Sequence, residues 1–497
     1  MQSKFELKRS SGILMPIFSL PSPYGIGTIG KAARDFVDFL ADAGQSWWQV
    51  LPLSQTSYGD SPYQSPSVFA GNPYFIDLDM LIDDGMLTRD EVESVDWGGD
   101  PERVDYGKLY ENRIELLKLA AERGMYKNSR KVSAFIIDNC EWLTDYALFM
   151  AIKRQNGMGS WLDWDKEIRL RRPEAVERCR RELSDEIRLY MFIQYLFYKQ
   201  WNELREYAHD RGVGIIGDLP IYVAMDSVDV WMEPENFMLN SKGYPTEVAG
   251  VPPDSFTDDG QLWGNPLYDY DKMKKDGFSW WIKRMGGAEK LYDVVRIDHF
   301  RGFESYWAVP YGETTAKNGH WVKGPGLELI GVLKNWFPNV SFIAEDLGYP
   351  TPEVREMLES SGMPGMKVME FAFDSRDDGS GMPYSFPENS ICYTGTHDNP
   401  PVLGWCETAP ESDVENARMF LGLNSEEGWN WGMIRGGMAS LSKVFIAQMQ
   451  DYLGLGLEGR INTPGTPEGN WRWRMSADAI TPELAPRIAK MTRLFRR

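Results

Sequence analysis

Eight short runs of apolar, β-branched and aromatic residues recur along this chain, each bounded by turn-forming residues. The stretches between them mostly carry the periodicity of amphipathic helices. Strands that alternate with helices favour a parallel sheet, and eight such units close a (β/α)8 barrel. We therefore expect an α/β fold of the TIM barrel class. The runs cover residues 12–18, 47–53, 214–223, 294–300, 341–348, 366–373, 391–398 and 444–454.

An open, doubly wound sheet is the alternative arrangement for the same elements. A G-x-G-x-x-G pattern follows the first run at residues 25–30, but on its own it is weak evidence for the dinucleotide site that often accompanies such sheets. No internal repeat of fixed period is visible, which argues against a solenoid or a propeller. The barrel is the preferred prediction.

The eight runs are unevenly spaced, which predicts insertions within one barrel that spans residues 1–497. Residues 79–210, approximately, carry helical patterns such as ENRIELLKLAAERG and predict a mostly helical insertion. Residues 224–290, approximately, are dense in Gly, Pro, Asp and aromatic residues and predict a loop-rich insertion. Long irregular segments often act as lids over a site, and we expect that role for the second insertion.

The net charge of −20 argues against nucleic acid or an anionic membrane as a partner, because both attract basic patches. A neutral substrate fits better. No window approaches the roughly 20 apolar residues of a membrane span, and the N-terminus does not resemble a signal peptide. These features predict a soluble, cytoplasmic protein. Its four cysteines lack CxxC spacing and are expected to be plain thiols, at positions Cys140, Cys179, Cys392 and Cys406.

Four of the expected strands end in a carboxylate. In a (β/α)8 barrel the C-terminal ends of the strands meet at one rim, where active sites lie. One Asp after a strand is more often a helix N-cap than a catalyst, but four strand-end acids together favour a functional site. They are Asp218 in IIGD, Asp298 in VVRID, Glu345 in FIAED and Asp398 in YTGTHD.

The surroundings of two of these acids predict different pKa values. Side chains alternate along a strand, so Arg296 lies beneath Asp298 and is expected to lower the pKa of that carboxyl group. Glu345 has mainly apolar or acidic neighbours, which raise a carboxyl pKa. An ionised carboxylate suits a nucleophile, and a protonated one suits a general acid. A pair of this kind, about 5 Å apart, is typical of retaining glycoside chemistry.

Two histidines lie near these acids. His397 is flanked by Gly and Asn in a turn, which makes it a candidate site residue. His299 alternates to the other face of its strand and by itself is more consistent with a packed histidine, so its role stays open. The sequences RIDH and THD also offer metal ligands, but a cationic Arg296 beneath them disfavours a metal, and we expect none.

Several long motifs resemble those of the 4-α-glucanotransferases, also called amylomaltases or disproportionating enzymes, which are related to the α-amylases. The likeness runs from about residue 10 to the C-terminus. The motifs are SLPSPYGIGTIG, WWQVLPLSQTSYGDSPYQSPSVFAGNPY, IIGDLPIYVAMDS, AGVPPDSFTDDGQLWGNPLY, VRIDHFRGFESYW, AEDLG, PGMKVMEFAF, YTGTHDN and RINTPGTPEGNWRWR.

The resemblance implies a role for each strand-end acid. It implies that Asp298 is the nucleophile, Glu345 the acid/base and Asp398 a third carboxylate that steadies the distorted sugar. Substrate-binding residues are also implied, with Asp218 and Tyr106 as the weakest assignments and Tyr106 placed at a secondary glucan site. They are Arg296, His397, Asp218, Tyr58, Tyr63, Asp254, Gln261, Trp263 and Tyr106. Pro400 and Pro401 depart from the family pattern, in which a polar pair is common.

The predicted activity is transfer of an α-1,4-glucan segment to the 4-hydroxyl of a glucan or glucose acceptor, without a cofactor. The aromatic content of 13% agrees with a glucan substrate, because sugar faces pack on flat rings. Two alternatives remain open at this point: an α-1,4-glucan hydrolase that uses the same carboxylates, and a non-catalytic glucan-binding protein. The oligomeric state is not predicted.

Overall fold

The computed structural model contains a closed barrel of eight parallel strands in the order β1-β12-β11-β10-β9-β6-β3-β2. It describes residues 5–57, 59–253, 258–348, 351–376, 381–466 and 468–497. The predicted TIM barrel is confirmed, and each predicted run contains or overlaps one barrel strand. The strands are β1 (Ser10–Leu14), β2 (Trp47–Gln49), β3 (Gly214–Leu219), β6 (Val294–Ile297), β9 (Ser341–Ala344), β10 (Gly365–Val368), β11 (Ser390–Tyr393) and β12 (Val444–Gln448).

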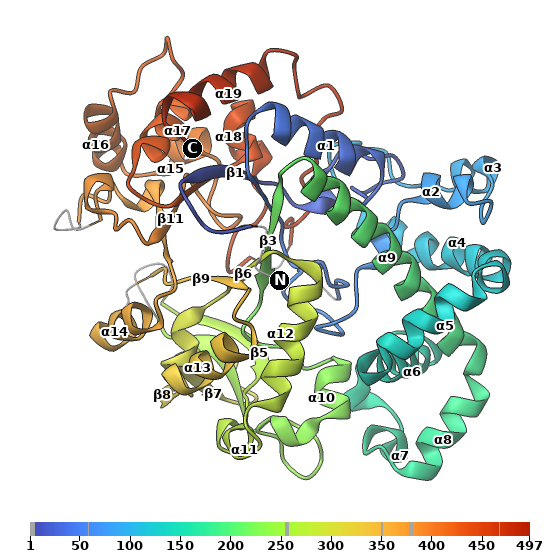
Figure 1. Cartoon of the computed structure of the whole chain (residues 1–497). Helices are drawn as coiled ribbons and strands as arrows, with labels where there is room; N and C mark the ends of the chain where they lie inside the picture. Colours follow the sequence, from blue (N-terminus) through green and yellow to red (C-terminus); the bar gives the residue numbers. More distant parts are fainter. Residues whose placement is uncertain (1–4, 58, 254–257, 349–350, 377–380, 467) are drawn as a thin grey trace.

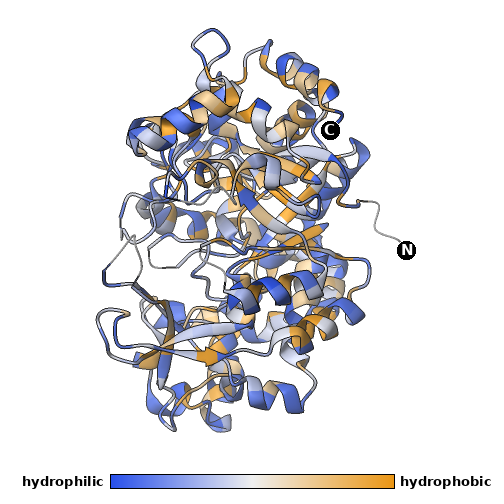
Figure 2. Ribbon diagram, turned by 90° about the vertical axis from the view of Figure 1, so that its left-hand side faces the viewer, coloured by the Kyte–Doolittle hydropathy of each residue, from blue (hydrophilic) through white to orange (hydrophobic). Residues whose placement is uncertain are grey.

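Helices surround the barrel, and the strands at its centre are its most apolar part (Figures 1 and 2). Most strand residues are fully buried because both faces of each strand are covered, by the barrel interior on one side and by helices on the other. The surrounding helices are α1 (Lys31–Asp42), α9 (Ser184–Asp210), α12 (Ser279–Leu291), α13 (Gly326–Trp336), α14 (Pro352–Ser361), α15 (Val402–Thr408), α16 (Glu411–Leu421), α17 (Trp429–Ala439), α18 (Met449–Leu453) and α19 (Leu484–Leu494).

The chain between β2 and β3 forms a group of helices on one side of the barrel (Figure 1). Its last member, α9, is long enough to pack both on this group and on the barrel wall, because it contacts α6 as well as α1. The other helices are α2 (Leu78–Asp83), α3 (Arg89–Glu93), α4 (Tyr106–Lys127), α5 (Ser129–Asp138), α6 (Cys140–Gln155), α7 (Lys166–Arg169) and α8 (Pro173–Glu182). Across the described ranges, every helix falls short of the length and apolar character that a membrane span requires.

A four-stranded antiparallel sheet in the order β5-β4-β7-β8 lies beside the barrel. Two of its strands come from the range 224–290, so the expectation of a loop-rich segment there is wrong in part; this range also contains α10 (Val228–Met232), α11 (Tyr270–Lys275) and α12. Local sequence could not show this, because β4 pairs with β7, which follows β6 in the chain. The strands are β4 (Glu247–Val251), β5 (Gln261–Pro266), β7 (Ser305–Pro310) and β8 (His320–Lys323).

Two glutamines on α9 form hydrogen bonds to the backbone of the segment that follows β2. Each side-chain amide bonds to both the N–H and the C=O of one residue, as the backbone of a neighbouring strand would. Gln194 accepts a hydrogen bond from the Gly71 amide at 2.8 Å and donates one to the Gly71 carbonyl at 2.9 Å. Gln200 repeats both bonds with Asp77, at 2.7 and 3.1 Å. Both glutamines are buried, so their amides satisfy backbone groups that water cannot reach.

Replacing Gln194 by Leu should therefore destabilise the protein. The change leaves the Gly71 N–H and C=O buried without partners, which costs about 1–3 kcal/mol for each unsatisfied group. Chemical denaturation of the wild type and the variant measures the loss. Gln155→Leu, at an exposed position at the end of α6, is the matched control and should stay within about 0.5 kcal/mol of wild type. Equal effects of the two variants would contradict this account of α9.

Candidate active site

Two of the strand-end acids occupy equivalent positions on neighbouring barrel strands. Ile297 of β6 pairs with Ala344 of β9, and the next residues in each strand are Asp298 and Glu345. The Glu345 amide donates to the Ile297 carbonyl at 3.0 Å, which continues the ladder to the rim. Neighbouring strands lie about 4.8 Å apart. The two acids therefore start from backbone positions at the same level and side by side.

The Arg296 guanidinium lies below this pair and bonds to two acids at once. Its Nη1 donates to both carboxylate oxygens of Asp218, at 2.7 and 2.8 Å, and to Asp298 Oδ1 at 2.9 Å. Arg296 and Asp218 are both nearly inaccessible to solvent, whereas the Asp298 side chain is 27% exposed. The expected position of Arg296 beneath Asp298 is thus observed. Its sharing with Asp218 was not expected.

Tyr63 joins Asp218 to the turn that follows β11. Its hydroxyl donates to Asp218 Oδ2 at 2.7 Å and lies 2.8 Å from His397 Nε2. The rings of Tyr63 and His397 also stack, with centroids 5.3 Å apart. His397 is buried, and its Nε2 lies 3.5 Å from Asp398 Oδ2. A residue distant in sequence therefore connects β3 to the turn bearing Asp398.

Asp398 is fixed by two residues that the sequence analysis did not assign. Asn462 Nδ2 donates to Asp398 Oδ1 at 2.6 Å, and Arg460 donates to the Asp398 backbone carbonyl at 2.9 Å. Both belong to the C-terminal motif RINTPGTPEGNWRWR, which was the available signal. The Asp398 side chain is 44% exposed, more than Asp298. Its carboxylate therefore has one oxygen tied to Asn462 and remains accessible.

The Glu345 carboxylate is held by two backbone amides. Oε2 accepts from the His299 N–H at 2.7 Å, and Oε1 accepts from the Leu347 N–H at 2.8 Å. His299 has a φ of 50°, in the left-handed region that a non-glycine residue rarely adopts. Burial lowers the pKa of its imidazole to about 3, so the ring is neutral, and the ring packs edge-on against Trp263. His299 is thus a packed histidine whose backbone contacts Glu345.

Burial raises the pKa of both acids in the pair. It raises the pKa of Glu345 to about 7, as expected in direction. It also raises the pKa of Asp298 to about 6, so the expected low pKa is wrong. Arg296 does lower the pKa of Asp298, but desolvation is the larger effect, and the nearby Asp218 carboxylate adds to it. Arg296 opposes the rise in the pKa of Glu345 as well.

The hairpin of β4 and β5 brings Gln261 and Trp263 towards the rim. Both are partly exposed, and the Trp263 indole donates to Gln261 Oε1 at 3.2 Å. Tyr58 and Asp254, also expected to bind substrate, lie outside the described residues. Tyr106 lies at the start of α4, is buried, and donates its hydroxyl to the Trp471 carbonyl at 2.8 Å. That environment leaves little of its ring to contact a sugar.

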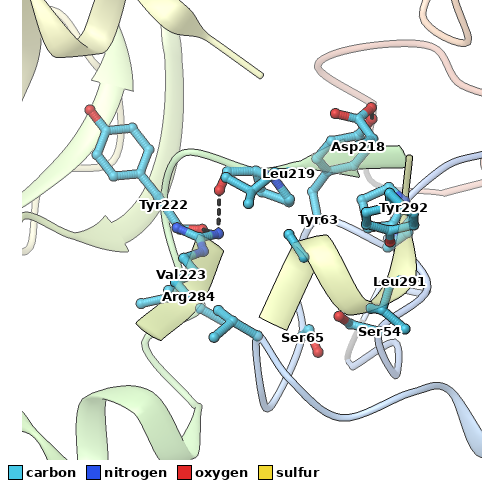
Figure 3. A pocket seen from close by; sticks show the side chains of 16 residues that line it. Ser54, Tyr63, Ser65, Asp218, Leu219, Tyr222, Val223, Arg284, Leu291 and Tyr292 are labelled. Carbon is cyan, nitrogen blue, oxygen red and sulfur yellow. Dashed lines mark hydrogen bonds between the residues drawn. The ribbon is translucent and has the colours of Figure 1, made fainter. Parts of the chain in front are cut away.

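A cavity of about 40 Å³ lies between the end of β3 and α12. Tyr63 and Asp218 reach it from one side, and Arg284 and Tyr222 from another (Figure 3). Arg284 donates to the Ile221 carbonyl at 2.9 Å, which fixes the chain just after β3. The cavity has room for water but not for a sugar ring.

Metal ligation has no support in the described part of the chain. No group of three or more His, Cys, Asp or Glu side chains there has the arrangement to hold an ion. The rim acids are bonded to Arg296, Asn462 and backbone amides instead.

Pro400 and Pro401 precede α15, where the Pro401 carbonyl accepts the first helical hydrogen bond from Trp405.

Comparison with known proteins identifies the family to which this chain belongs. A family model described as 4-alpha-glucanotransferase matches residues 15–480. The chain belongs to the 4-alpha-glucanotransferase family. The 4-alpha-glucanotransferase of Clostridium butyricum is 47% identical to it, over 97% of this chain and 100% of the relative. The chloroplastic/amyloplastic 4-alpha-glucanotransferase of Solanum tuberosum is 40% identical, over 97% of this chain and 85% of the relative.

Solved structures extend the comparison to the fold. An amylomaltase from Streptococcus agalactiae, determined in complex with acarbose, superposes with a TM-score of 0.96 at 43% identity, covering 99% of this chain and 100% of the other. An amylomaltase from Corynebacterium glutamicum has a TM-score of 0.79 at 17% identity, covering 97% and 75%, and supports the fold alone. The protein is therefore an enzyme of the 4-alpha-glucanotransferase family, as the sequence motifs predicted.

In this 4-alpha-glucanotransferase, Tyr63→Phe should lower kcat/KM for disproportionation by roughly 10- to 100-fold. The change removes the hydroxyl bridge between Asp218 and His397, and a hydrogen bond to a charged group contributes about 1.5–3 kcal/mol. Tyr207→Phe is the matched control, because Tyr207 also donates to a carboxylate, Asp38, at 2.9 Å, but does so on α9 at the outer surface. Unchanged kinetics for Tyr63→Phe would contradict the bridging role.

Proposed function

We propose that this enzyme transfers a segment of an α-1,4-glucan to the 4-hydroxyl of a glucan or glucose acceptor by a retaining double displacement. The observation that supports this best is the pair at the ends of β6 and β9. Asp298 and Glu345 lie side by side, one bonded to Arg296 and the other to two backbone amides. Retaining enzymes place two carboxyl groups about 5–5.5 Å apart, a separation that adjacent strands favour.

In the first step, Asp298 attacks the anomeric carbon of the donor glucan. The bond from that carbon to the bridging oxygen breaks, and Glu345 gives its proton to the leaving oxygen. The hydrogen bond from Arg296 stabilises the ionised form of Asp298, which the attack requires. The raised pKa of Glu345 favours the protonated form that donation requires. The product is a glycosyl ester on Asp298.

In the second step, the 4-hydroxyl of an acceptor sugar attacks the same carbon. Glu345, now ionised, removes the hydroxyl proton, and the ester bond to Asp298 breaks. Two inversions at one carbon give net retention. The two amides on Glu345 keep its direction constant while its charge changes, because backbone donors from His299 and Leu347 do not depend on side-chain rotamers. This chemistry needs no cofactor.

The remaining rim residues are proposed to bind the sugar at the cleavage point. Asp398 has an accessible carboxylate oxygen, with the other oxygen held by Asn462, and suits contact with sugar hydroxyls. His397 and Tyr63 form one stacked wall next to it. Trp263, partly exposed on β5, offers a flat ring for a neighbouring sugar. The acarbose complex of the Streptococcus agalactiae amylomaltase makes acarbose a suitable binding probe.

Hydrolysis by the same carboxylates is the alternative outcome of the ester intermediate. Incubation with maltotriose distinguishes the two activities. Transfer should give glucose together with maltopentaose and longer oligosaccharides, because a maltosyl unit moves to a second maltotriose. A product set that contains only sugars shorter than maltotriose would contradict the transferase proposal. Chromatography of the reaction at early times measures both.

Variants at the two acids should separate their roles. Glu345→Ala should lower kcat/KM on maltotriose by at least about 10³-fold but much less on α-maltosyl fluoride, whose leaving group needs no proton. Azide should then accelerate turnover and give an α-glycosyl azide, since azide needs no general base.

The fall in wild-type kcat/KM above about pH 7, where Glu345 ionises, should disappear with the fluoride substrate.

Asp298→Asn should be inactive on both maltotriose and α-maltosyl fluoride while it still binds acarbose. A non-catalytic glucan-binding protein would instead show the same behaviour with and without this change. If Asp298→Asn kept full transfer activity, the assignment of the nucleophile would be wrong. Isothermal titration with acarbose checks that the variant retains a folded site.

The partners proposed are the glucan donor and the acceptor sugar. Location in the cytoplasm stays a prediction from the sequence; the name of the Solanum tuberosum relative places that protein in plastids.

A further inference from the structure

The buried acid Glu370 has no part in the mechanism above. It lies in the 3-10 helix Met369–Phe371, directly after β10, and is 3% exposed. Its amide donates to the carbonyl of Thr394, the residue that follows β11, at 3.3 Å. The side chain therefore lies inside the rim, near the start of the turn that carries His397 and Asp398.

Neither carboxyl oxygen of Glu370 makes a hydrogen bond of standard length and angle within the described part of the chain, although the Asn399 side chain is close enough to lower its pKa. A Cβ atom placed on Gly395 would lie 2.8 Å from Glu370 Oε1 and 3.0 Å from Gln448 Nε2, so both side chains are close to this glycine. The other side-chain atom of Gln448, Oε1, is also buried without a partner. A carboxyl group and an amide, each with an unsatisfied acceptor, are thus neighbours.

An ionised Glu370 would leave these acceptors unsatisfied, whereas a protonated one supplies the missing hydrogen. The O–H of a neutral carboxyl can donate to the Gln448 amide oxygen, which has no other partner, while the Gln448 amide nitrogen keeps its bond to the Pro400 carbonyl at 3.3 Å. Buried polar groups are rarely left without partners, so the neutral form fits this environment better.

The charged groups around Glu370 favour the same form. Burial, followed by the Asp451 carboxylate on α18, raises the pKa of Glu370 well above its usual value. Arg460, just after the 3-10 helix Leu457–Gly459, acts in the opposite direction, as does the Asn399 amide. The Arg460 guanidinium, however, bonds to the carbonyls of Asp398 and Asn462. The thiol of Cys406 on α15 also faces the group.

The turn above Glu370 carries the proposed third carboxylate. Asn399 Oδ1 accepts from both the amide and the hydroxyl of Thr396, each at 2.9 Å, which closes the turn around His397 and Asp398. A Cβ atom placed on Gly395 would also lie 3.0 Å from Asn399 Cβ, so Asn399 is close to the same glycine as the Glu370 carboxyl group. The acid therefore contacts the turn from below, opposite its exposed side.

We propose that Glu370 is a positioning residue, kept as a neutral carboxylic acid that bonds to the Gln448 amide and supports the 395–399 turn bearing His397 and Asp398. The proposal rests on the proposed role of Asp398 in binding the sugar. Glu370 itself does not touch the reacting atoms. Its ionisation would place a charge beneath the turn and displace Asp398.

Two variants test the requirement for a neutral hydrogen-bonding group. Glu370→Gln keeps the shape and a donor without a charge, and should retain kcat for maltotriose disproportionation within about threefold at pH 7. Glu370→Leu keeps the volume but not the donor, and should lower kcat roughly tenfold or more. A loss of tenfold or more in Glu370→Gln, or full activity in Glu370→Leu, would overturn the proposal.

The pH dependence of stability tests the neutral form without reference to catalysis. A raised pKa means that the folded protein holds the proton more tightly than the unfolded chain, whose glutamate pKa is about 4.3. Wild-type stability therefore falls as pH rises above that value, and Glu370→Gln lacks this loss. The Tm advantage of Glu370→Gln should grow by roughly 2–4 °C between pH 5 and pH 8.

Asp451, Cys406 and Arg460 are unchanged in both proteins, so their titrations largely cancel in that difference. A Tm difference that is constant with pH would overturn the neutral assignment, even if Asp398 proved to have another role. The infrared difference spectrum between wild type and Glu370→Gln at pH 7 gives a direct readout. It should contain the C=O stretch of a protonated carboxyl group, and a carboxylate band alone would contradict the proposal.

Discussion

The bonds of one buried arginine hold the mouth of the barrel together. Arg296 neutralises Asp218 and Asp298, two acids that would otherwise repel each other inside a desolvated site. Tyr63 links Asp218 to His397, and Asn462 and Arg460 link the turn that bears Asp398 to the C-terminal motif. Segments far apart in the chain thus meet at one cation. Without Arg296 the two acids would lose the positive charge that offsets their repulsion, and the pKa of Asp298 would rise further.

The parallel pairing of β6 with β9 sets the positions of Asp298 and Glu345 relative to each other. β6 and β9 are paired residue by residue to their ends, so the two acids need no loop to bring them together. Asp398, by contrast, lies in a turn and depends on side chains for its position. Asn462 and Arg460 donate hydrogen bonds to Asp398, the Asp398 amide donates to the Thr396 hydroxyl, and that hydroxyl donates to Asn399 Oδ1; these bonds replace the ladder there.

The sequence predicted the barrel and its acids because both follow from short-range patterns. A buried strand and the acid that ends it are adjacent in the chain, as in VVRID and FIAED. Long-range pairing left no such pattern: β4 joins β7 across β6, and Asn462 contacts Asp398 across 64 positions. The pKa of Asp298 could not be predicted either. The effect of Arg296 was visible in the sequence, but burial and the competing Asp218 depend on the closed barrel.

The hydrogen bonds that Gln194 and Gln200 of α9 make to the segment after β2 affect the order in which the chain folds during synthesis. Gly71 and Gln194 are separated by 123 residues, and so are Asp77 and Gln200. During synthesis the segment after β2 leaves the ribosome long before the helix that fixes it. The backbone at Gly71 and Asp77 therefore cannot form these hydrogen bonds until α9 has emerged. Barrel closure waits longer still, because β1 pairs with β12 near the other end of the chain. The closed rim that carries the carboxylates is thus among the last features that the nascent chain completes.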